Sequence, residues 1–239
     1  MIGVWLHTTE FWIPAAIIAV VSYLLGCFNG AVIISKYILH NDVRNHGSGN
    51  AGLTNFHRTF GGPLTFLVIL CDVLKAVAAL LFAVWLMERM LPYESVAFMG
   101  FAADSADGIA AWRVMETAVL AKYWAALFCL LGHMFPCMFH FRGGKGILSG
   151  GTIAIMLDWR IALVVWGGFI LLVLLTRYVS LGSVWAGGSF PFATWILYPQ
   201  FVIVVLGFLC GGLVVWKHRG NIGRLLSGTE SKFSLHKKK

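Results

Sequence analysis

A ten-residue stretch from His46 to Asn55 has the composition of an anion-binding loop. It reads His-Gly-Ser-Gly-Asn-Ala-Gly-Leu-Thr-Asn. Its glycines let the backbone approach a ligand closely, and successive N–H groups in such a turn form a concave anion site. Arg44 and Arg58 flank it with charge. A flexible surface loop is the alternative. The candidate ligand-binding residues here are Ser48, Gly49, Asn50, Thr54, Asn55 and Arg58.

A second glycine turn, Gly143-Gly144-Lys145-Gly146, stands directly before an apolar run that begins at Ile147. A glycine turn that opens a helix directs N–H groups and the positive end of the dipole at an anion, and Lys145 adds a point charge suited to phosphate. The spacing of a nucleotide-binding P-loop is missing, and Ile147 stands where Ser or Thr would be needed. The alternative is a positively charged membrane-anchor loop.

Two further segments carry polar groups at helical spacing. Ser180 and Ser183 could supply hydroxyl donors to the same anion, or simply begin a helix. If the last helix continues past its apolar part, His218 and Asn221 share a face and could bind a phosphate oxygen or orient a hydroxyl. A basic helix that binds anionic lipid head groups is the alternative for this segment.

The rest of the chain has the composition of an integral membrane protein. Its 239 residues are 59% hydrophobic and 12% charged, against about 25% charged in soluble domains. The apolar runs are continuous, which favours helices over a barrel. We expect an all-α polytopic protein with about seven spans: 12–34, 63–87, 123–139, 147–157, 161–175, a segment from Ser183 to about Tyr198, and 201–216.

The positive charge and the cysteines follow this membrane pattern. The net charge of +8 is spread over several connectors and therefore indicates orientation, not nucleic-acid binding. All five cysteines lie in or beside apolar runs without a C-x-x-C pair, so we interpret them as small buried hydrophobes and expect no metal and no cofactor. The N-terminus lacks a basic region and a cleavage site, which predicts a retained first span.

An odd number of spans brings all four polar segments to one side of the membrane. The positive-inside rule places that side and the C-terminus in the cytoplasm, with the N-terminus outside. Residues 1–239 would form one domain with an extended outer connector at about 88–122. In span two, Asp72 and Lys75 are three residues apart and can pair, either as a functional group or as a structural ion pair.

The chain offers many anion donors but no recognisable nucleophile or base. His133 has no acidic partner nearby in sequence, no metal-binding spacing appears, and the H-x-x-x-x-D pattern of other glycerolipid acyltransferases occurs at none of the eight histidines. This profile is typical of transfer between phosphate-bearing substrates by positioning and charge stabilisation.

Together, the four segments resemble a family. The blocks at 46–55, 132–146, 177–183 and 218–230, in this order, are similar to those of the PlsY-type bacterial acyl-phosphate:glycerol-3-phosphate acyltransferases. The resemblance implies a seven-span inner-membrane enzyme that makes 1-acyl-glycerol 3-phosphate (lysophosphatidic acid) and phosphate, with no protein base. By motif position it implies substrate-binding and catalytic roles for Ser48, Asn50, Thr54, Arg58, Lys145, Ser180, His218 and Asn221.

The implied partners are acyl phosphate, glycerol 3-phosphate, membrane lipids and other enzymes of phospholipid synthesis. The chain departs from the family pattern at Arg142, at 147–149 and at Gly220, which bears on acyl-chain preference and on the fourth span. Two alternatives from other classes are a small-anion transporter of the phosphate type and a structural protein that binds anionic lipids. A transport path would need polar positions reaching from both membrane faces, whereas these blocks gather at one.

Overall fold

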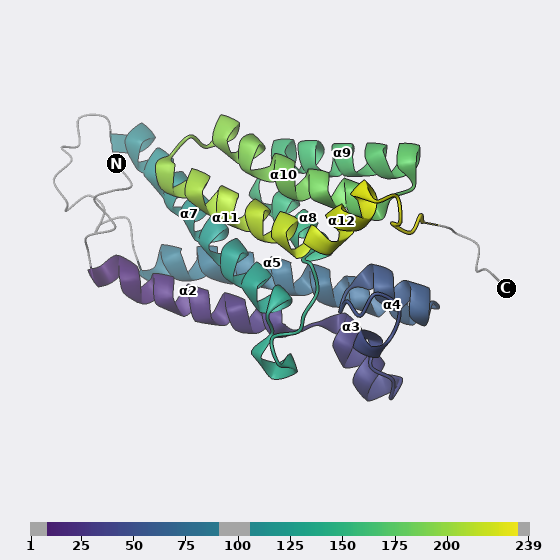
Figure 1. The fold of residues 1–239 in the computed structure, drawn as a ribbon. Helices are drawn as coiled ribbons and strands as arrows, with labels where there is room; N and C mark the ends of the chain where they lie inside the picture. Colours follow the sequence, from purple (N-terminus) through teal and green to yellow (C-terminus); the bar gives the residue numbers. More distant parts are fainter. Residues whose placement is uncertain (1–8, 91–105, 234–239) are drawn as a thin grey trace.

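The computed structural model describes residues 9–90 and 106–233, and every regular element in those ranges is a helix (Figure 1). The all-helical prediction is confirmed, and a helix lies at each predicted apolar segment. These helices are α2 (Thr9–Cys27), α5 (Leu64–Met90), α7 (Ala106–Met134), α8 (Ile147–Leu157), α9 (Trp159–Thr176), α10 (Val179–Leu197) and α11 (Phe201–Lys217).

Not every helix has the length of a membrane span. Among the described residues, four segments are long and apolar enough: Phe11–Ile38, Leu64–Met90, Thr117–Phe139 and Trp159–Thr176. The pair α11 and α12 (Arg219–Leu226), bent by 55°, would make a fifth. The 11 residues of α8 are fewer than the 20 or so that cross a bilayer. Seven crossings therefore stay a prediction, although the helices themselves are present.

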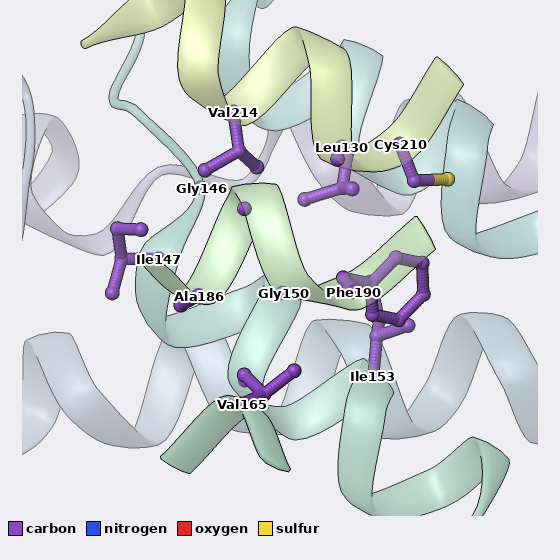
Figure 2. A pocket seen from close by; sticks show the side chains of 13 residues that line it. Leu130, Gly146, Ile147, Gly150, Ile153, Val165, Ala186, Phe190, Cys210 and Val214 are labelled. Carbon is purple, nitrogen blue, oxygen red and sulfur yellow. The ribbon is translucent and has the colours of Figure 1, made fainter. Parts of the chain in front are cut away.

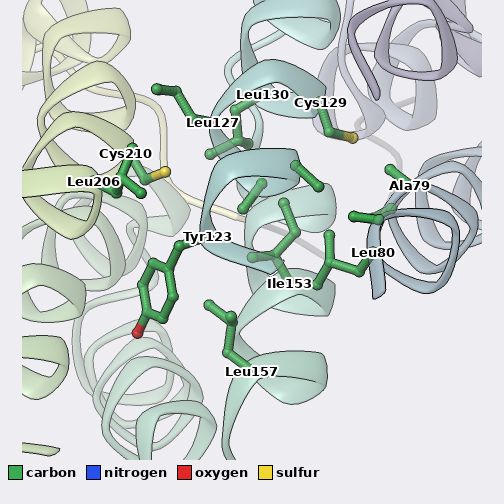
Figure 3. Packing of buried hydrophobic residues seen from close by; sticks show 14 of the residues in the cluster. Ala79, Leu80, Tyr123, Leu127, Cys129, Leu130, Ile153, Leu157, Leu206 and Cys210 are labelled. Atoms are coloured by element: carbon green, nitrogen blue, oxygen red, sulfur yellow. The ribbon is translucent and has the colours of Figure 1, made fainter. Parts of the chain in front are cut away.

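The core lies where α7 meets its neighbours (Figure 3). Helix α7 packs against α2, α5, α8 and α11, while α10 packs between α9 and α11. Tyr123 and Leu130 of α7 face Leu80 of α5, Ile153 of α8 and Leu206 of α11 within one cluster of buried side chains. In contrast, α9 is mostly unburied despite its apolar sequence, as expected for a helix that faces lipid.

The first span is interrupted where a continuous helix is predicted. Helix α2 ends at Cys27, Asn29 caps the short helix α3 (Gly30–Ile33), and a π-helical turn, η1 (Ile34–Ile38), follows. The Asn29 Oδ1 accepts a hydrogen bond from the Val32 N–H at 3.1 Å, and its Nδ2 donates to the Ala51 carbonyl at 2.9 Å. The interruption therefore joins α2 to the glycine loop at 46–55.

One smaller prediction is wrong, because the cysteines are not uniformly buried: Cys137 in the turn η3 (Cys137–Phe139) is exposed. The outer connector at about 88–122 stays a prediction. Helix α5 runs to Met90, α7 begins at Ala106, and residues 91–105 lie outside the described part.

Candidate functional site

A cavity of about 720 Å³ at one end of the bundle is lined by all four predicted segments. Four segments meet here, at the end marked by α4 and α12 in Figure 1: the glycine loop at 46–55, the loop at 143–146 (the lysine loop), the start of α10 and the α11–α12 junction. The sequence-predicted residues that line it are Ser48, Thr54, Asn55, Arg58, Lys145, Ser180, Ser183, His218 and Asn221. Gly49, Asn50, Gly143 and Gly144 lie outside the lining, and Gly146 lines a neighbouring apolar cleft.

Asn55 holds the glycine loop in shape. Its side chain is buried at the start of α4 (Leu53–Thr59). Its Nδ2 lies 3.0 Å from the carbonyl oxygens of Val43, His46 and Asn50, and its Oδ1 accepts from the Ser48 N–H at 3.0 Å. Its hydrogen-bonding capacity is thus used inside the loop, so the structure supports a loop-organising role more directly than ligand contact.

The two arginines that flank the loop have different surroundings. Arg44 forms a 2.7 Å ion pair with Asp42 and donates to the Phe139 carbonyl at 3.0 Å, so it fastens the loop and does not line the cavity. Arg58 is exposed at the cavity edge, where its Nη1 lies 2.9 Å from the Ser231 Oγ. Of these two arginines, Arg58 is the one that lines the cavity.

Lys145 projects from a loop that rests on the end of α7. The N–H groups of Gly143 and Gly144 donate to the carbonyls of Met134 and His133 at 3.3 and 3.1 Å. Gly146 takes a φ of +80° as it caps α8, a conformation that favours glycine. Burial lowers the pKa of Lys145 to about 8, with nearby Arg224 adding to the decrease. The Lys145 Nζ donates to the Asn221 Oδ1.

His218, at the junction of α11 and α12, is a buried neutral imidazole. Burial lowers its pKa to about 4. Its Nδ1 lies 2.8 Å from the Val214 carbonyl oxygen, which can only accept, so Nδ1 carries the proton. The Nε2 is then an acceptor. This arrangement favours binding of a hydroxyl hydrogen over donation to a phosphate oxygen, the two options that the sequence leaves open.

Seven lining residues were not among the sequence candidates, and three of them, Arg224, Glu230 and Ser231, come from α12 and the segment after it. Glu230 accepts from the Asn221 Nδ2 at 2.8 Å and from the Arg224 Nε at 2.7 Å. Burial alone would raise the pKa of Glu230, but these two hydrogen bonds hold it below its ordinary value. Glu230 closes the block of sequence that carries the family resemblance, which is the signal that could have identified it.

The serines of α10 form the facing wall. Both are buried, and the Ser183 Oγ donates to the Val179 carbonyl at 2.8 Å, one helical turn earlier. The Ser180 Oγ is buried and has no hydrogen-bond partner among the described residues. Ser180 is therefore the better placed of the two to donate its hydroxyl to a bound ligand.

A narrow apolar cleft adjoins the polar cavity (Figure 2). It lies between α7, α8, α9, α10 and α11, and its free volume is about 30 Å³. Gly146, next to Lys145, and Val214, whose carbonyl binds His218, line one part of it; Ile153, Phe190 and Cys210 line another. Anion-binding groups and an apolar cleft therefore meet at Lys145 and His218.

The pH dependence of turnover should reflect the ionisation of the Lys145 ammonium group. With its pKa lowered to about 8, the ammonium form is lost as the pH rises through 8, so kcat/KM should fall above that value. Lys145→Arg, whose guanidinium stays charged, should move this decrease to higher pH even if it turns over more slowly. Initial rates across pH 6 to 10 test this. An alkaline decrease at the same pH in both proteins would exclude Lys145 as its origin.

Comparisons with known proteins agree with this geometry. The family model for glycerol-3-phosphate acyltransferase matches residues 16–228. The chain is 37% identical to a glycerol-3-phosphate acyltransferase of Clostridioides difficile, over 92% of this chain and 96% of the relative. It is 34% identical to one of Thermoanaerobacter sp. (strain X514), over 91% and 95%.

Solved structures lead to the same family. The glycerol 3-phosphate form of PlsY, an integral membrane glycerol 3-phosphate acyltransferase, superposes with a TM-score of 0.71 at 29% identity, covering 92% of this chain and 96% of that one. Its lysophosphatidic acid form superposes with a TM-score of 0.68 at 28% identity. On the family model and these relatives together, the chain belongs to the PlsY family of integral membrane glycerol-3-phosphate acyltransferases.

Proposed function

We propose that the protein transfers a fatty acyl group from acyl phosphate to the C1 hydroxyl of sn-glycerol 3-phosphate, releasing lysophosphatidic acid and inorganic phosphate. The observation that carries this proposal is the single cavity in which Arg58, Lys145 and Arg224 gather beside an apolar cleft. Its volume lies within the range of about 300–1,000 Å³ typical of small-molecule sites. Related PlsY structures are described with glycerol 3-phosphate and with lysophosphatidic acid, which supports the acceptor and the product.

The residues divide into two groups by charge and position. Lys145, beside the cleft and at the N-terminus of α8, would bind the phosphate of the acyl donor, with Gly143, Gly144 and Gly146 shaping its loop. Arg58 and Asn221 would bind the phosphate of the acceptor, with Thr54, Ser180 and Ser183 nearby. The Ser48 hydroxyl, which lines the cavity, would stabilise the oxyanion. The predicted contribution of Gly49 and Asn50 is less direct, because both lie outside the lining and the Gly49 N–H donates to the His46 carbonyl at 2.9 Å.

The reaction needs no protein nucleophile. The C1 hydroxyl oxygen forms a bond to the acyl carbon, the bond from that carbon to the phosphate oxygen breaks, and the hydroxyl proton passes to the departing phosphate. The His218 Nε2, an acceptor in the neutral ring, would hold that hydroxyl in line with the acyl carbon. Lys145 would offset the negative charge that builds on the departing phosphate.

The membrane location follows from charge asymmetry. Lys36, Arg58, Arg142, Arg177 and Arg219 belong to the connectors that the topology places at the end bearing the cavity. By the positive-inside rule this end would face the cytoplasm, in the inner membrane of a bacterium. Water-soluble glycerol 3-phosphate would then reach the cavity from the cytoplasm, while the acyl chain remains between the helices.

The donor is tested directly with purified protein in detergent. Labelled glycerol 3-phosphate is incubated with palmitoyl phosphate, with palmitoyl-CoA or with neither. Labelled lysophosphatidic acid should form with the acyl phosphate alone, and inorganic phosphate should appear in equal amount. Product formation from acyl-CoA but not from acyl phosphate would overturn the proposed donor while leaving the family assignment intact.

Acyl-chain preference should depend on the apolar cleft. Because only about 30 Å³ of the cleft is open to a molecule of the size of water, we expect the first methylenes to occupy it and the rest of the chain to continue between the helices. Gly150 lines the cleft, and a Cβ there would meet only Leu130, at 3.8 Å. Gly150→Leu should therefore raise KM for long acyl phosphates with little effect on KM for glycerol 3-phosphate.

Gly212 of α11 provides the matched control. It is exposed, lies outside the cleft, and a Cβ there would meet nothing within 4 Å. Gly212→Leu should keep the wild-type preference across acyl phosphates of increasing chain length. Equal chain-length profiles for Gly150→Leu, Gly212→Leu and the wild type would show that the acyl chain binds elsewhere.

A further inference from the structure

Three buried ionisable side chains lie outside the cavity and have no part in the reaction described above. They are Asp72 and Lys75 of α5 and His133 of α7, each no more than 4% exposed. The predicted pairing is confirmed, with the Lys75 Nζ 2.7 Å from the Asp72 Oδ1. His133 joins them from a distant part of the chain, its Nδ1 lying 2.7 Å from the Lys75 Nζ and 3.5 Å from the Asp72 Oδ1.

Lys75 connects three segments of the chain. Its Nζ forms an ion pair with the Asp72 carboxylate and donates hydrogen bonds to the His133 Nδ1 and to the Phe28 carbonyl, the last at 3.0 Å. The cluster therefore joins α5, the last turn of α7 and the interruption after α2. Since a buried ion pair stabilises a fold no better than well-packed apolar residues do, its fixed geometry needs another reason.

The other edge of the His133 ring contacts the lysine loop. A Cβ at Gly144 would lie 2.2 Å from the His133 Nε2, so the ring packs directly against the glycine backbone. The Gly144 N–H also donates to the His133 carbonyl at 3.1 Å. Lys145 is the next residue, so the orientation of His133 bears on the position of the Lys145 ammonium.

The same elements reach the other walls of the cavity. The Lys217 Nζ, one residue before His218, donates to the Met134 carbonyl at 3.0 Å. Asn29, one residue after Phe28, binds the Ala51 carbonyl of the glycine loop. The last turn of α7 and the α2 interruption thus hold the glycine loop, the lysine loop and the His218 junction, and the buried cluster joins these two supports.

We propose that Asp72, Lys75 and His133 are positioning residues for acyl transfer, which set the place of Lys145 relative to the glycine loop. This inference rests on the proposed role of Lys145. Kinetics distinguishes this role from a purely structural one. A variant in which apolar side chains replace the charged pair should fold as well as the wild type but still turn over slowly.

The principal test is the double variant Asp72→Val/Lys75→Met, which removes both charges together and leaves neither unpaired. We expect it to fold but to lose about 100-fold in kcat, as misplacement by an ångström can cause, with little change in KM for glycerol 3-phosphate. His133→Asn, which keeps an acceptor near the Nδ1 position but loses the Nε2 edge, should show the same split between kcat and KM.

A double-mutant measurement tests whether the cluster acts through Lys145. If the cluster acts through Lys145, adding Asp72→Val/Lys75→Met to Lys145→Ala should cost little beyond Lys145→Ala alone. Tyr123→Phe is the matched control. Tyr123 lies on α7, as His133 does, and this change removes its buried 2.9 Å hydrogen bond to Thr194 of α10. This variant should keep the wild-type kcat. Thermal unfolding and gel filtration in detergent check that each variant is folded.

Each possible result of these measurements either supports or overturns the positioning role. A folded double variant with wild-type kcat, or a loss that adds fully to that of Lys145→Ala, would overturn the positioning role. Failure of both cluster variants to fold would assign the cluster to stability and also overturn it. Wild-type turnover by Lys145→Ala would remove the proposed role of Lys145 and this inference with it, whereas a slow Lys145→Ala beside a fast cluster variant would remove this inference alone.

Discussion

Lys145→Ala should lower kcat by about 100- to 1,000-fold, the cost of losing one preorganised group that meets developing charge. Lys145 is the cation where the polar cavity meets the apolar cleft, and it stands at the N-terminus of α8. The scissile bond of an acyl phosphate lies between its polar and apolar parts, so it should lie here. Because the charge on the departing phosphate grows during the reaction, the loss should appear in kcat more than in KM.

Arg142 supplies the control for this experiment. It lies three residues earlier, is exposed, and does not line the cavity. Arg142→Ala removes the same charge from the same loop and should leave kcat unchanged. Steady-state rates with palmitoyl phosphate and labelled glycerol 3-phosphate measure both variants. A Lys145→Ala protein as fast as Arg142→Ala would contradict the proposed role.

His218→Ala should lower turnover by about 100-fold or more, the range for groups that orient or exchange a proton with a reacting hydroxyl. The reason is the Nε2, which the Nδ1–Val214 hydrogen bond leaves as an acceptor. Two conservative variants separate the ring nitrogens. His218→Asn places an amide near Nδ1 and should be as slow as alanine, whereas His218→Gln can place an oxygen near Nε2 and should retain part of the activity.

His57 serves as the matched histidine control, since it is exposed on α4 and does not line the cavity. Replacing it by alanine should leave turnover unchanged. Rates are measured for folded protein only, as judged by gel filtration. If His218→Asn were as active as the wild type, the function of His218 would lie in its hydrogen bond to Val214, and its proposed contact with the acceptor hydroxyl would be wrong.

Much of the fold is predictable because apolar runs of this kind must be helical in lipid. Helix α8 begins and ends at Ile147 and Leu157, where the sequence predicts, since glycine opens it and Asp158 caps the next helix. The interruption at Asn29 was missed because it depends on a contact with Ala51, which hydropathy cannot report. The lysine loop was found because glycine and lysine before a helix have a local physical meaning.

Long-range pairing limits what the sequence shows of the site. Asp72 and Lys75 are close in sequence and their pairing could be predicted, whereas His133 reaches them from another helix. Arg44 and Arg58 look alike beside the glycine loop in sequence, whereas in the structure Arg44 pairs with Asp42 and Arg58 contacts Ser231 at the cavity edge. Glu230 was missed because its partners lie across a turn at Gly228, where φ is +70°.

The return of the chain after α12 has a consequence for biosynthesis. Ser231 bonds to Arg58, and the Phe233 N–H donates to the Arg177 carbonyl at 2.7 Å, so these residues complete one rim of the cavity. They are translated after every helix of the bundle. A nascent chain whose helices have already entered the bilayer therefore still has an unfinished binding site, and it gains that rim only once residues 230–233 have left the ribosome.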